Sequence, residues 1–242
     1  MILEGNVSVK AAVMGSCRNV TKLIIDREKH DRDTAFIIHR AEEKKIPVEY
    51  VSRAEADAMA EGRTHGGVLC EAEGRMFQSA EDCLKAEVPL LFLIEGVEDP
   101  FNLGYIMRTV YSAGCTGLIL PERNWENAEK VIIRSSAGAS EYLNIIMEKD
   151  LPALIRRLKK AGVACYAAMR KDARVYDEID CTVPLLIAVG GEMRGLSAAV
   201  RREITDNIYI PYANDFRNAL NAASAAAVLS YEAARQRRKK GM

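Results

Sequence analysis

Short apolar runs alternate with amphipathic stretches along the chain. In the first part, residues 20–26, 46–52 and 66–72 are apolar runs bounded by charge, glycine or proline, a pattern typical of strands. Residues 33–45 and 53–62 lie between them and place apolar side chains at helical spacing. Strands that alternate with helices predict a small α/β layer structure.

The alternation restarts at residue 90 with more strongly apolar strands. Such runs are expected where a strand is buried on both faces of a parallel sheet. The predicted strands are residues 90–97, 117–122, 141–147, 164–169, 185–191 and 207–212, and helices are predicted around 102–113, 151–161, 197–205 and 217–238. The fold class predicted is α/β, with a mostly parallel sheet covered by helices on both sides.

A polar, charged segment, EGRMFQSAEDCLKAEVP, separates these two parts. We predict a first domain over residues 1–75, a linker over 76–89 and a larger domain over 90–242. A chain of 242 residues is long enough for two modest domains with cores of their own.

The overall charge gives no general attraction to a polyanion. The 34 lysines and arginines equal the 34 aspartates and glutamates, so nucleic acid would have to be held by local patches. The best candidate is the tail ARQRRKKGM, residues 234–242. Its cations also suit the carbonyl end of a helix, and the sequence leaves both interpretations open.

Cysteine and histidine show no metal-binding arrangement. The six cysteines form no C-x-x-C pair and the three histidines are scattered, so we expect reduced, mostly buried thiols and no metal site. The N-terminus lacks the apolar run of a signal peptide, and no stretch is apolar enough to span a membrane. We therefore expect a cytoplasmic protein.

The common nucleotide-binding motifs do not occur in this sequence. No G-x-G-x-x-G follows a strand and no G-x-x-x-x-G-K-[ST] is present. A conventional dinucleotide site or P-loop is therefore not expected.

Unusual residues instead follow three predicted strands, at the edge where open α/β sheets bind ligands. In the first segment Pro100 and Gly104 are predicted to shape a turn, with Asn102 at a helix entrance and Arg108 further along. The second contains paired glycines and Glu192. In the third, FRNALNAASAAAV, a helix is predicted to begin near Asn218. Taken singly, Arg108 could be an exposed helix arginine, Glu192 could place a charge at the start of a helix, and the alanines of the third segment could reflect close packing. Together, the three segments indicate a ligand site.

Together the three segments resemble the motifs of the SpoU, or TrmH, family of RNA ribose 2′-O-methyltransferases, within the SPOUT superfamily. The matching stretches are DPFNLGYIMR, LIAVGGEMRGL and IPYANDFRNALNAASAAAVLSYEAARQR, and SSAGASEYL is also similar. Order and spacing agree over residues 90–238. The first part is similar, more loosely, to the L30e-like substrate-binding domain of that family, in EGNVSVKAAV, RNVTKLIID, KKIPVEYVS and HGGVLCEA.

The resemblance implies an enzyme that uses S-adenosylmethionine, with a deep trefoil knot, a homodimer formed through the knotted domain, and a structured RNA substrate, ribosomal RNA more than transfer RNA. It implies catalytic roles for Arg108, Asn102, Glu192 and Asn221. An arginine pKa above about 12 makes a literal general base awkward, so we favour orientation and electrostatic help from Arg108. The cofactor residues that it implies are Gly190, Gly191, Glu192, Gly195, Ile210, Leu220 and Asn221.

The chain departs from the family pattern in the third motif. Ala219 stands where serine is usual, and the loop is one residue longer, with Asn214 where glycine is typical. Asn218 or Ser224, each three residues from Asn221 on a helix, could replace the missing hydroxyl. Two alternatives therefore stay open: an RNA-binding protein with weak or lost chemistry, and an enzyme that methylates a base nitrogen, against which Arg108 argues.

Overall fold

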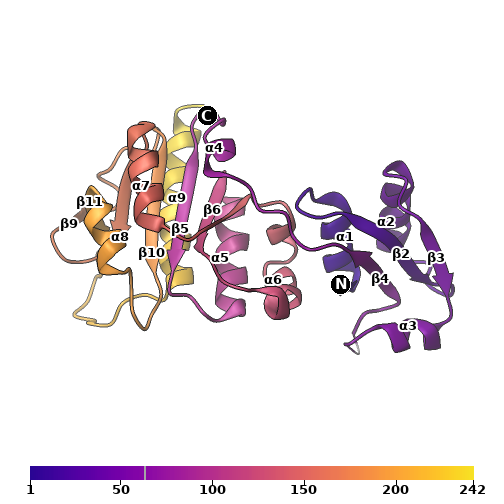
Figure 1. Cartoon of the computed structure of the whole chain (residues 1–242). Helices are drawn as coiled ribbons and strands as arrows, with labels where there is room; N and C mark the ends of the chain where they lie inside the picture. The colour runs from indigo at the N-terminus through magenta and orange to yellow at the C-terminus, as the bar shows by residue number, and fades with distance from the viewer. Residues whose placement is uncertain (63) are drawn as a thin grey trace.

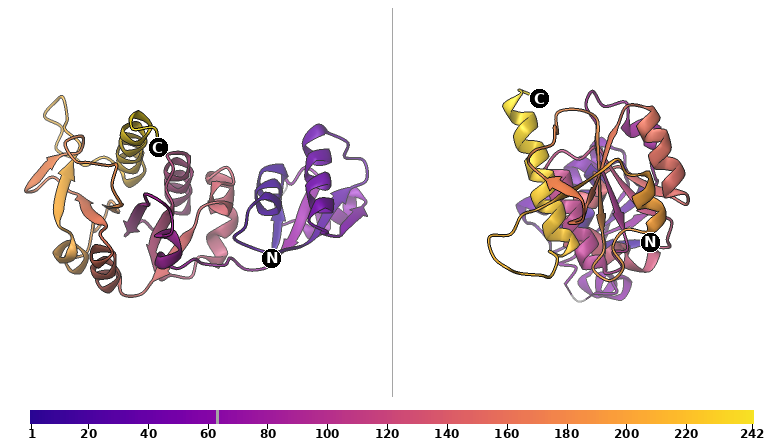
Figure 2. Two further views of the ribbon diagram at one scale, coloured as in Figure 1. Left: turned by 90° about the horizontal axis from the view of Figure 1, so that it is seen from above. Right: turned by 90° about the vertical axis from the view of Figure 1, so that its left-hand side faces the viewer.

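The computed structural model describes residues 1–62 and 64–242 and contains two separate β-sheets (Figure 1). Strands from the first 72 residues form the smaller sheet, and strands from residue 90 onward form the larger one. The two units lie end to end in an elongated molecule (Figure 2). None of the helices in the described ranges combines the length and the apolar character that a membrane span needs.

The first unit is a four-stranded mixed sheet in the order β1-β4-β2-β3. β2 runs parallel to β3 and antiparallel to β4, and β1 pairs antiparallel with β4. The three predicted strands are present, whereas β1 and α1 were not foreseen. The elements are β1 (Ile2–Glu4), α1 (Asn6–Met14), β2 (Val20–Asp26), α2 (Arg32–Glu43), β3 (Val48–Val51), α3 (Arg53–Met59) and β4 (Val68–Ala72).

The second unit is a seven-stranded sheet in the order β7-β6-β5-β10-β8-β11-β9, and its strands pair in parallel throughout the described residues. This confirms the predicted α/β class with a mostly parallel sheet. The strands are β5 (Leu90–Glu95), β6 (Gly117–Pro121), β7 (Ile145–Glu148), β8 (Ala164–Ala168), β9 (Ala173–Val175), β10 (Leu185–Gly190) and β11 (Asp206–Tyr209). Most connections between these parallel strands contain helices, and the helices cover both faces of the sheet.

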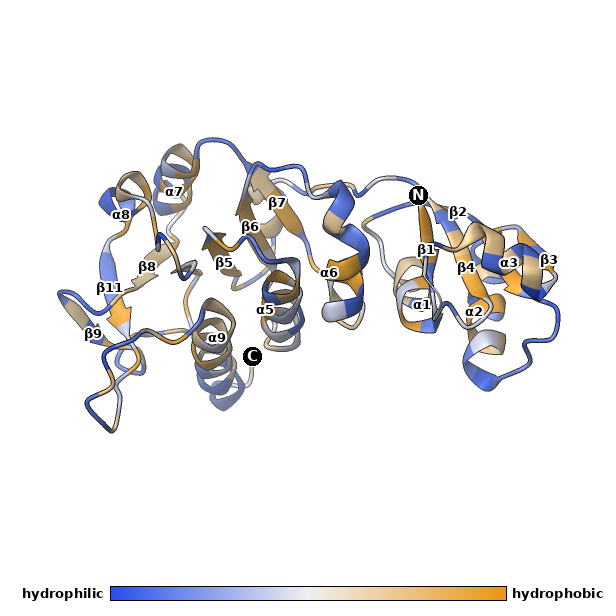
Figure 3. Cartoon of the chain, turned by 90° about the horizontal axis from the view of Figure 1, so that it is seen from below, coloured by the Kyte–Doolittle hydropathy of each residue, from blue (hydrophilic) through white to orange (hydrophobic). Residues whose placement is uncertain are grey.

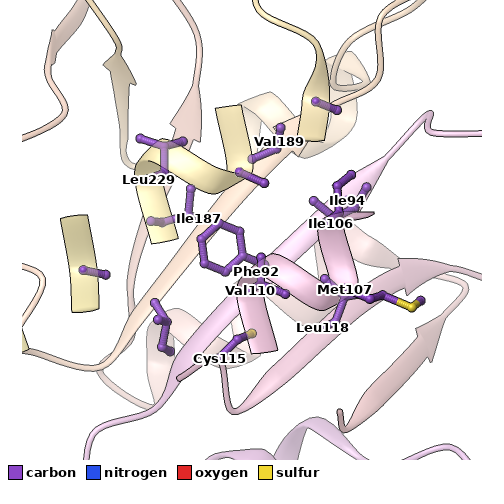
Figure 4. Close-up of a cluster of buried hydrophobic side chains, with 14 of the residues drawn as sticks. Phe92, Ile94, Ile106, Met107, Val110, Cys115, Leu118, Ile187, Val189 and Leu229 are labelled. Atoms are coloured by element: carbon purple, nitrogen blue, oxygen red, sulfur yellow. The ribbon is translucent and has the colours of Figure 1, made fainter. Parts of the chain in front are cut away.

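Helices α5 (Pro100–Ser112), α6 (Glu129–Ser135) and α9 (Ala222–Lys239) lie on one face, and α7 (Leu151–Lys160) and α8 (Ala198–Glu203) lie on the other (Figure 2). The side chains of the central strands alternate between the two resulting cores, so Phe92 packs toward α5 and α9 while Leu93 packs toward α7. Phe92 has no exposed surface and lies among side chains of α5, β10 and α9 (Figure 4). The orange, apolar faces of the strands and helices turn inward in Figure 3.

Three local predictions about the second unit were wrong. Glu141 was placed in a strand, but it ends a short 3₁₀ helix, Ala139–Glu141, and β7 begins only at Ile145. The last helix begins at Ala222 and not near Asn218. Gly104 lies inside α5, where a Cβ would clash with Ser135 of α6, so it permits close helix packing and does not shape a turn.

A buried charge cluster joins the two units. The Arg18 Nε donates to Glu141 Oε2 at 2.6 Å, and the Arg18 Nη2 donates to Glu129 Oε1 at 3.1 Å. Arg75 binds the same two carboxylates, and the side chains of Arg18 and Glu141 are fully buried. Burial by itself would raise the pKa of Glu141, but the charges of Arg75 and Arg18 hold it below its usual value. Ile133 of α6 also packs into the core of the first unit.

The segment between the sheets contains one short helix, α4 (Ala80–Cys83), within the predicted linker. The domain boundaries at residues 75 and 89 stay predictions, as does the trefoil knot. The predicted buried thiols are present: all six cysteines are free and buried.

Candidate functional site

The carboxyl ends of β5, β10, β8 and β11 meet at one edge of the larger sheet because these strands run parallel. The register places Gly190 opposite Glu95, and Ala168 opposite Ile208. The second and third predicted segments leave the sheet from β10 and β11, and the first leaves it from β5. The structure therefore brings the three segments to the same edge, as expected for an open α/β sheet.

Close backbone contact helps to hold the first two segments together. The Gly191 N–H donates to the Glu95 carbonyl at 2.7 Å, and a Cβ on Gly191 would clash with the carbonyl oxygen of Gly96. The Gly195 N–H donates back to the Gly191 carbonyl at 2.9 Å, with Gly195 at φ +61°. Glycine is required at position 191 because the two loops approach so closely.

A cavity of about 350 Å³ opens above β8, β10 and β11. Its volume lies within the range of about 300–1,000 Å³ that is usual for small-molecule sites. Six of the seven residues predicted to bind the cofactor lie in its wall: Gly190, Gly191, Glu192, Gly195, Ile210 and Leu220. Ala219 of the third motif also lies in this wall.

A second cavity, of about 660 Å³, lies beside the first. The two share Glu192, Arg194, Gly195 and Ala222, so they form neighbouring compartments of one site. Asn102 lines the second cavity from the first turn of α5. Two of the four predicted catalytic residues, Asn102 and Glu192, are therefore at one place.

Arg108 lies apart from Asn102 and Glu192. Its side chain is exposed on α5, and it is not among the described residues that line either cavity. It shares a helical face with Phe101 and Tyr105, seven and three residues earlier, whose exposed fractions are 53% and 49%. One copy of the chain does not bring Arg108 to the cavity walls.

Asn221, the last of the four predicted catalytic residues, has a structural role in this conformation. Its Oδ1 accepts a hydrogen bond from the Ser224 N–H at 2.7 Å, which makes it the N-cap of α9. Asn218 lies in the preceding loop, so Asn218 and Asn221 do not share the helical face on which the predicted substitution for the missing hydroxyl depended.

Arg170 and Tyr212 belong to the first cavity wall, yet sequence reasoning missed them. Arg170 follows β8, one of the strands whose carboxyl end forms the site. A cation directly after a buried parallel strand was the available signal, but it belongs to no motif.

None of the thiols offers a ready nucleophile. Burial raises the pKa of Cys115 to about 12 and that of Cys17 to about 11, so both are protonated at neutral pH. The described residues contain no group of three or more histidine, cysteine, aspartate or glutamate side chains placed to hold a metal ion.

Two protein families together match most of the sequence. The SpoU rRNA Methylase family matches residues 89–231, and the family described as RNA 2′-O ribose methyltransferase substrate binding matches residues 2–78. The chain therefore belongs to the SpoU rRNA methylase family. This confirms the predicted enzyme class, an RNA 2′-O-methyltransferase.

Individual relatives extend over nearly the whole chain. A putative TrmH family tRNA/rRNA methyltransferase, YacO of Bacillus subtilis, is 30% identical and covers 83% of this chain and 82% of its own length. The 23S rRNA (guanosine-2′-O-)-methyltransferase RlmB of Shewanella oneidensis is 28% identical over 98% of both chains.

A solved structure shares the fold of the whole chain. The SpoU methyltransferase AviRb from Streptomyces viridochromogenes, in complex with the cofactor AdoMet, superimposes with a TM-score of 0.79 at 22% identity, covering 99% of this chain and 91% of AviRb. The cofactor predicted here, S-adenosylmethionine, is the one bound in that structure.

Proposed function

We propose that this protein transfers a methyl group from S-adenosylmethionine to a ribose 2′-hydroxyl of structured ribosomal RNA. The observation that carries the proposal is the double cavity at the carboxyl ends of the parallel strands, lined by the second and third motifs. Membership of the SpoU family gives the reaction class, and the residues that line the double cavity support the roles proposed below.

The smaller cavity fits S-adenosylmethionine in size and in chemistry. Gly190, Ile210 and Leu220 offer backbone and apolar surface to an adenosine group, while Arg194 and Arg201 supply cations for the carboxylate of its amino-acid part. When bound, the cofactor supplies an electrophilic methyl group on a sulfonium. The wall residues hold and orient it, and this ordering accounts for much of the rate because effective molarities reach about 10⁵ M.

The larger cavity is then the place of the target nucleotide. Asn102 can hydrogen-bond a ribose hydroxyl with either its amide oxygen or its nitrogen. Glu192 lies in the walls of both cavities and so can orient groups at their boundary. Asn221 contributes by fixing the start of α9, directly after Leu220 in the cofactor cavity wall.

We assign Arg108 to the activation of the 2′-hydroxyl by orientation and positive charge, with the proton passing to a neighbour or to water. Because Arg108 shares the exposed face of α5 with Phe101 and Tyr105, this assignment includes a homodimer formed through α5 and the adjacent α9. Tyr231 adds a further exposed aromatic side chain, 54% exposed, on α9. Arg108 thus lies in the proposed interface and acts in the assembled enzyme.

The first unit is proposed to bind the RNA. The family that matches residues 2–78 is described as substrate binding. RlmB of Shewanella oneidensis, which matches nearly the full chain, is a 23S rRNA methyltransferase, and this favours ribosomal over transfer RNA.

Methyl transfer to RNA tests the proposal. Purified protein is incubated with methyl-labelled S-adenosylmethionine and total RNA from a strain that lacks the gene, and the product is digested with alkali. Alkali cleaves RNA through the 2′-oxygen, so ribose methylation leaves the label in resistant dinucleotides. Arg108→Ala should lose at least about a hundredfold in rate, whereas Arg156→Ala, which removes an exposed arginine on α7 paired with Glu203, should retain it.

Other outcomes would replace the proposal. Label in mononucleotides would mean base methylation and would contradict the role of Arg108. RNA and cofactor binding with no label would support a binding protein that has lost its chemistry, and Ala219→Ser would then be the variant to test for restored transfer. Label in transfer RNA alone would mean that the substrate is transfer RNA and not ribosomal RNA.

A further inference from the structure

The loop between β11 and α9, residues 211–220, closes one side of the cofactor cavity but has almost no fixing contacts of its own. It projects from the second unit (Figure 2) and contains no helix or strand. Tyr212 is half-buried, and every other residue of the loop is exposed. Among the described residues, its backbone makes no hydrogen bond to other backbone groups.

Within residues 1–62 and 64–242, the hydrogen bonds made to this loop come from one side chain. The Arg170 Nη1 donates to the Arg217 carbonyl at 3.0 Å, and its Nη2 donates to the Asn218 carbonyl at 2.9 Å. The same guanidinium lies over the ring of Tyr212, 4.2 Å from its centroid. Tyr212 in turn stacks on Phe216, with the ring centroids 6.1 Å apart. Arg170 therefore contacts both the beginning and the end of the loop.

The residues on both sides of Arg170 are hydrogen-bonded to β11. The N–H of Met169, just before it, donates to the Ile208 carbonyl at 2.9 Å, and the Lys171 carbonyl, just after it, accepts from the Asn207 side chain at 2.9 Å. Both partners belong to β11 in the sheet. A planar guanidinium with several donors can bind two carbonyls and stack on a ring at once, which an ammonium group cannot do.

We propose that Arg170 is the positioning residue that holds the 211–220 loop in its cofactor-binding conformation. The two carbonyls that it binds directly precede Ala219 and Leu220, which line the cavity. Without Arg170 the loop samples many conformations. The affinity for the cofactor then decreases in proportion to the population of the binding conformation. This assignment rests on the proposed function, because it names how the same cavity is kept ready for S-adenosylmethionine.

Ordering a loop costs conformational entropy. Because the described backbone of residues 211–220 makes no hydrogen bond to other backbone groups, this loop needs an anchor from outside. Arg170 is an anchor of this kind.

Calorimetry with S-adenosylmethionine and kinetics of methyl transfer test the assignment. Arg170→Ala should raise the dissociation constant for S-adenosylmethionine about tenfold, and it should raise KM for the cofactor while kcat at saturation changes little. Arg170→Lys keeps the charge but not the two-point contact, so it should fall between Arg170→Ala and the wild type. The matched control is Arg174→Ala, which removes an exposed arginine of β9 bonded to Asp206, outside the cavity wall.

Limited trypsin digestion reports on the loop without using the cofactor. The Arg217 carbonyl, bound by Arg170, belongs to a bond that trypsin can cut. Arg170→Ala should be cleaved there about tenfold faster than the wild type, and S-adenosylhomocysteine should slow the cleavage. Thermal melting should change little in all three variants, because both arginines are exposed.

The results separate this inference from the proposed function. A wild-type protein that binds and uses S-adenosylmethionine, with an Arg170→Ala variant that binds equally well and is cleaved no faster, would overturn the role of Arg170 alone. A wild-type protein that binds no S-adenosylmethionine would overturn both. If Arg170→Ala and Arg174→Ala lost the same affinity for S-adenosylmethionine, the removal of any nearby positive charge would explain the effect. That result would also overturn the assignment.

Discussion

Replacing Arg18 by methionine should loosen the connection between the two units. Arg18 lies in the first unit, and Glu129 and Glu141, its partners, lie in the second. Methionine fills much of the same volume but leaves the Glu141 carboxylate, which is fully buried, with one cationic partner fewer. The variant therefore tests whether this cluster holds the two sheets in one arrangement.

The size of the effect follows from burial. Removing one partner of a buried ion pair costs about 3–5 kcal/mol, because an uncompensated charge remains. Arg75 still binds Oε1 of Glu141, which places the expected loss at the lower end, about 3 kcal/mol. The same change at the exposed pair of Arg156 and Glu203 should cost no more than about 1 kcal/mol.

Urea unfolding followed by the fluorescence of Trp125, the sole tryptophan, measures the free energy of unfolding. The double variant Arg18→Met with Glu141→Gln should lose less than the sum of the two single variants, since the uncompensated charge is gone. If Arg18→Met costs no more than Arg156→Met, or if the two changes are additive, the cluster does not hold the units together and the reasoning fails.

Three further results are expected. Gly191→Ala should lower the free energy of unfolding by about 1–3 kcal/mol, because its methyl group would clash with the Gly96 carbonyl; an unchanged urea midpoint would contradict the close approach of the two loops. Asn221→Ala should cost about 1 kcal/mol through loss of the α9 cap, whereas Asn221→Ser should cost less in the same titration. Since the pKa of Glu141 is lower in the folded protein, its stabilising effect is complete above pH 4.5 and disappears as the pH falls below that value. Acid titration of wild type and Glu141→Gln should show the steeper loss in the wild type.

Much of the fold could be predicted because the signals are local. β2 and β5 consist of apolar runs ended by charge, and the alternation of strands with helices specifies the parallel sheet. The strand prediction at Glu141 failed because the decisive contacts come from Arg18 and Arg75, more than 60 residues away. No local pattern shows that a glutamate will be buried by arginines of the other unit.

Only those parts of the candidate site that have a local signal in the sequence could be predicted. Gly191 and Gly195 occur in a motif, and their backbone geometry requires the residue type that the motif contains. The start of α9 was misplaced because Asn218 to Leu220 have no strong helix breaker, and only the cap formed by Asn221 decides where the helix begins. Arg170 was missed because its importance depends on a loop more than 40 residues further along the chain.

The buried cluster of Arg18, Arg75, Glu129 and Glu141 has a consequence for how an RNA can be recognised. A flexible connection would let the first unit capture any accessible RNA element and search for a nucleotide to modify. A buried charge cluster that holds the two units in one arrangement, as the Arg18→Met variant tests, would prevent this search. On the proposed function, the RNA feature held by the first unit and the ribose that enters the second would then have to lie at one fixed separation and orientation. Selection of the methylated nucleotide then depends on the three-dimensional shape of the folded RNA as well as on the bases around the target.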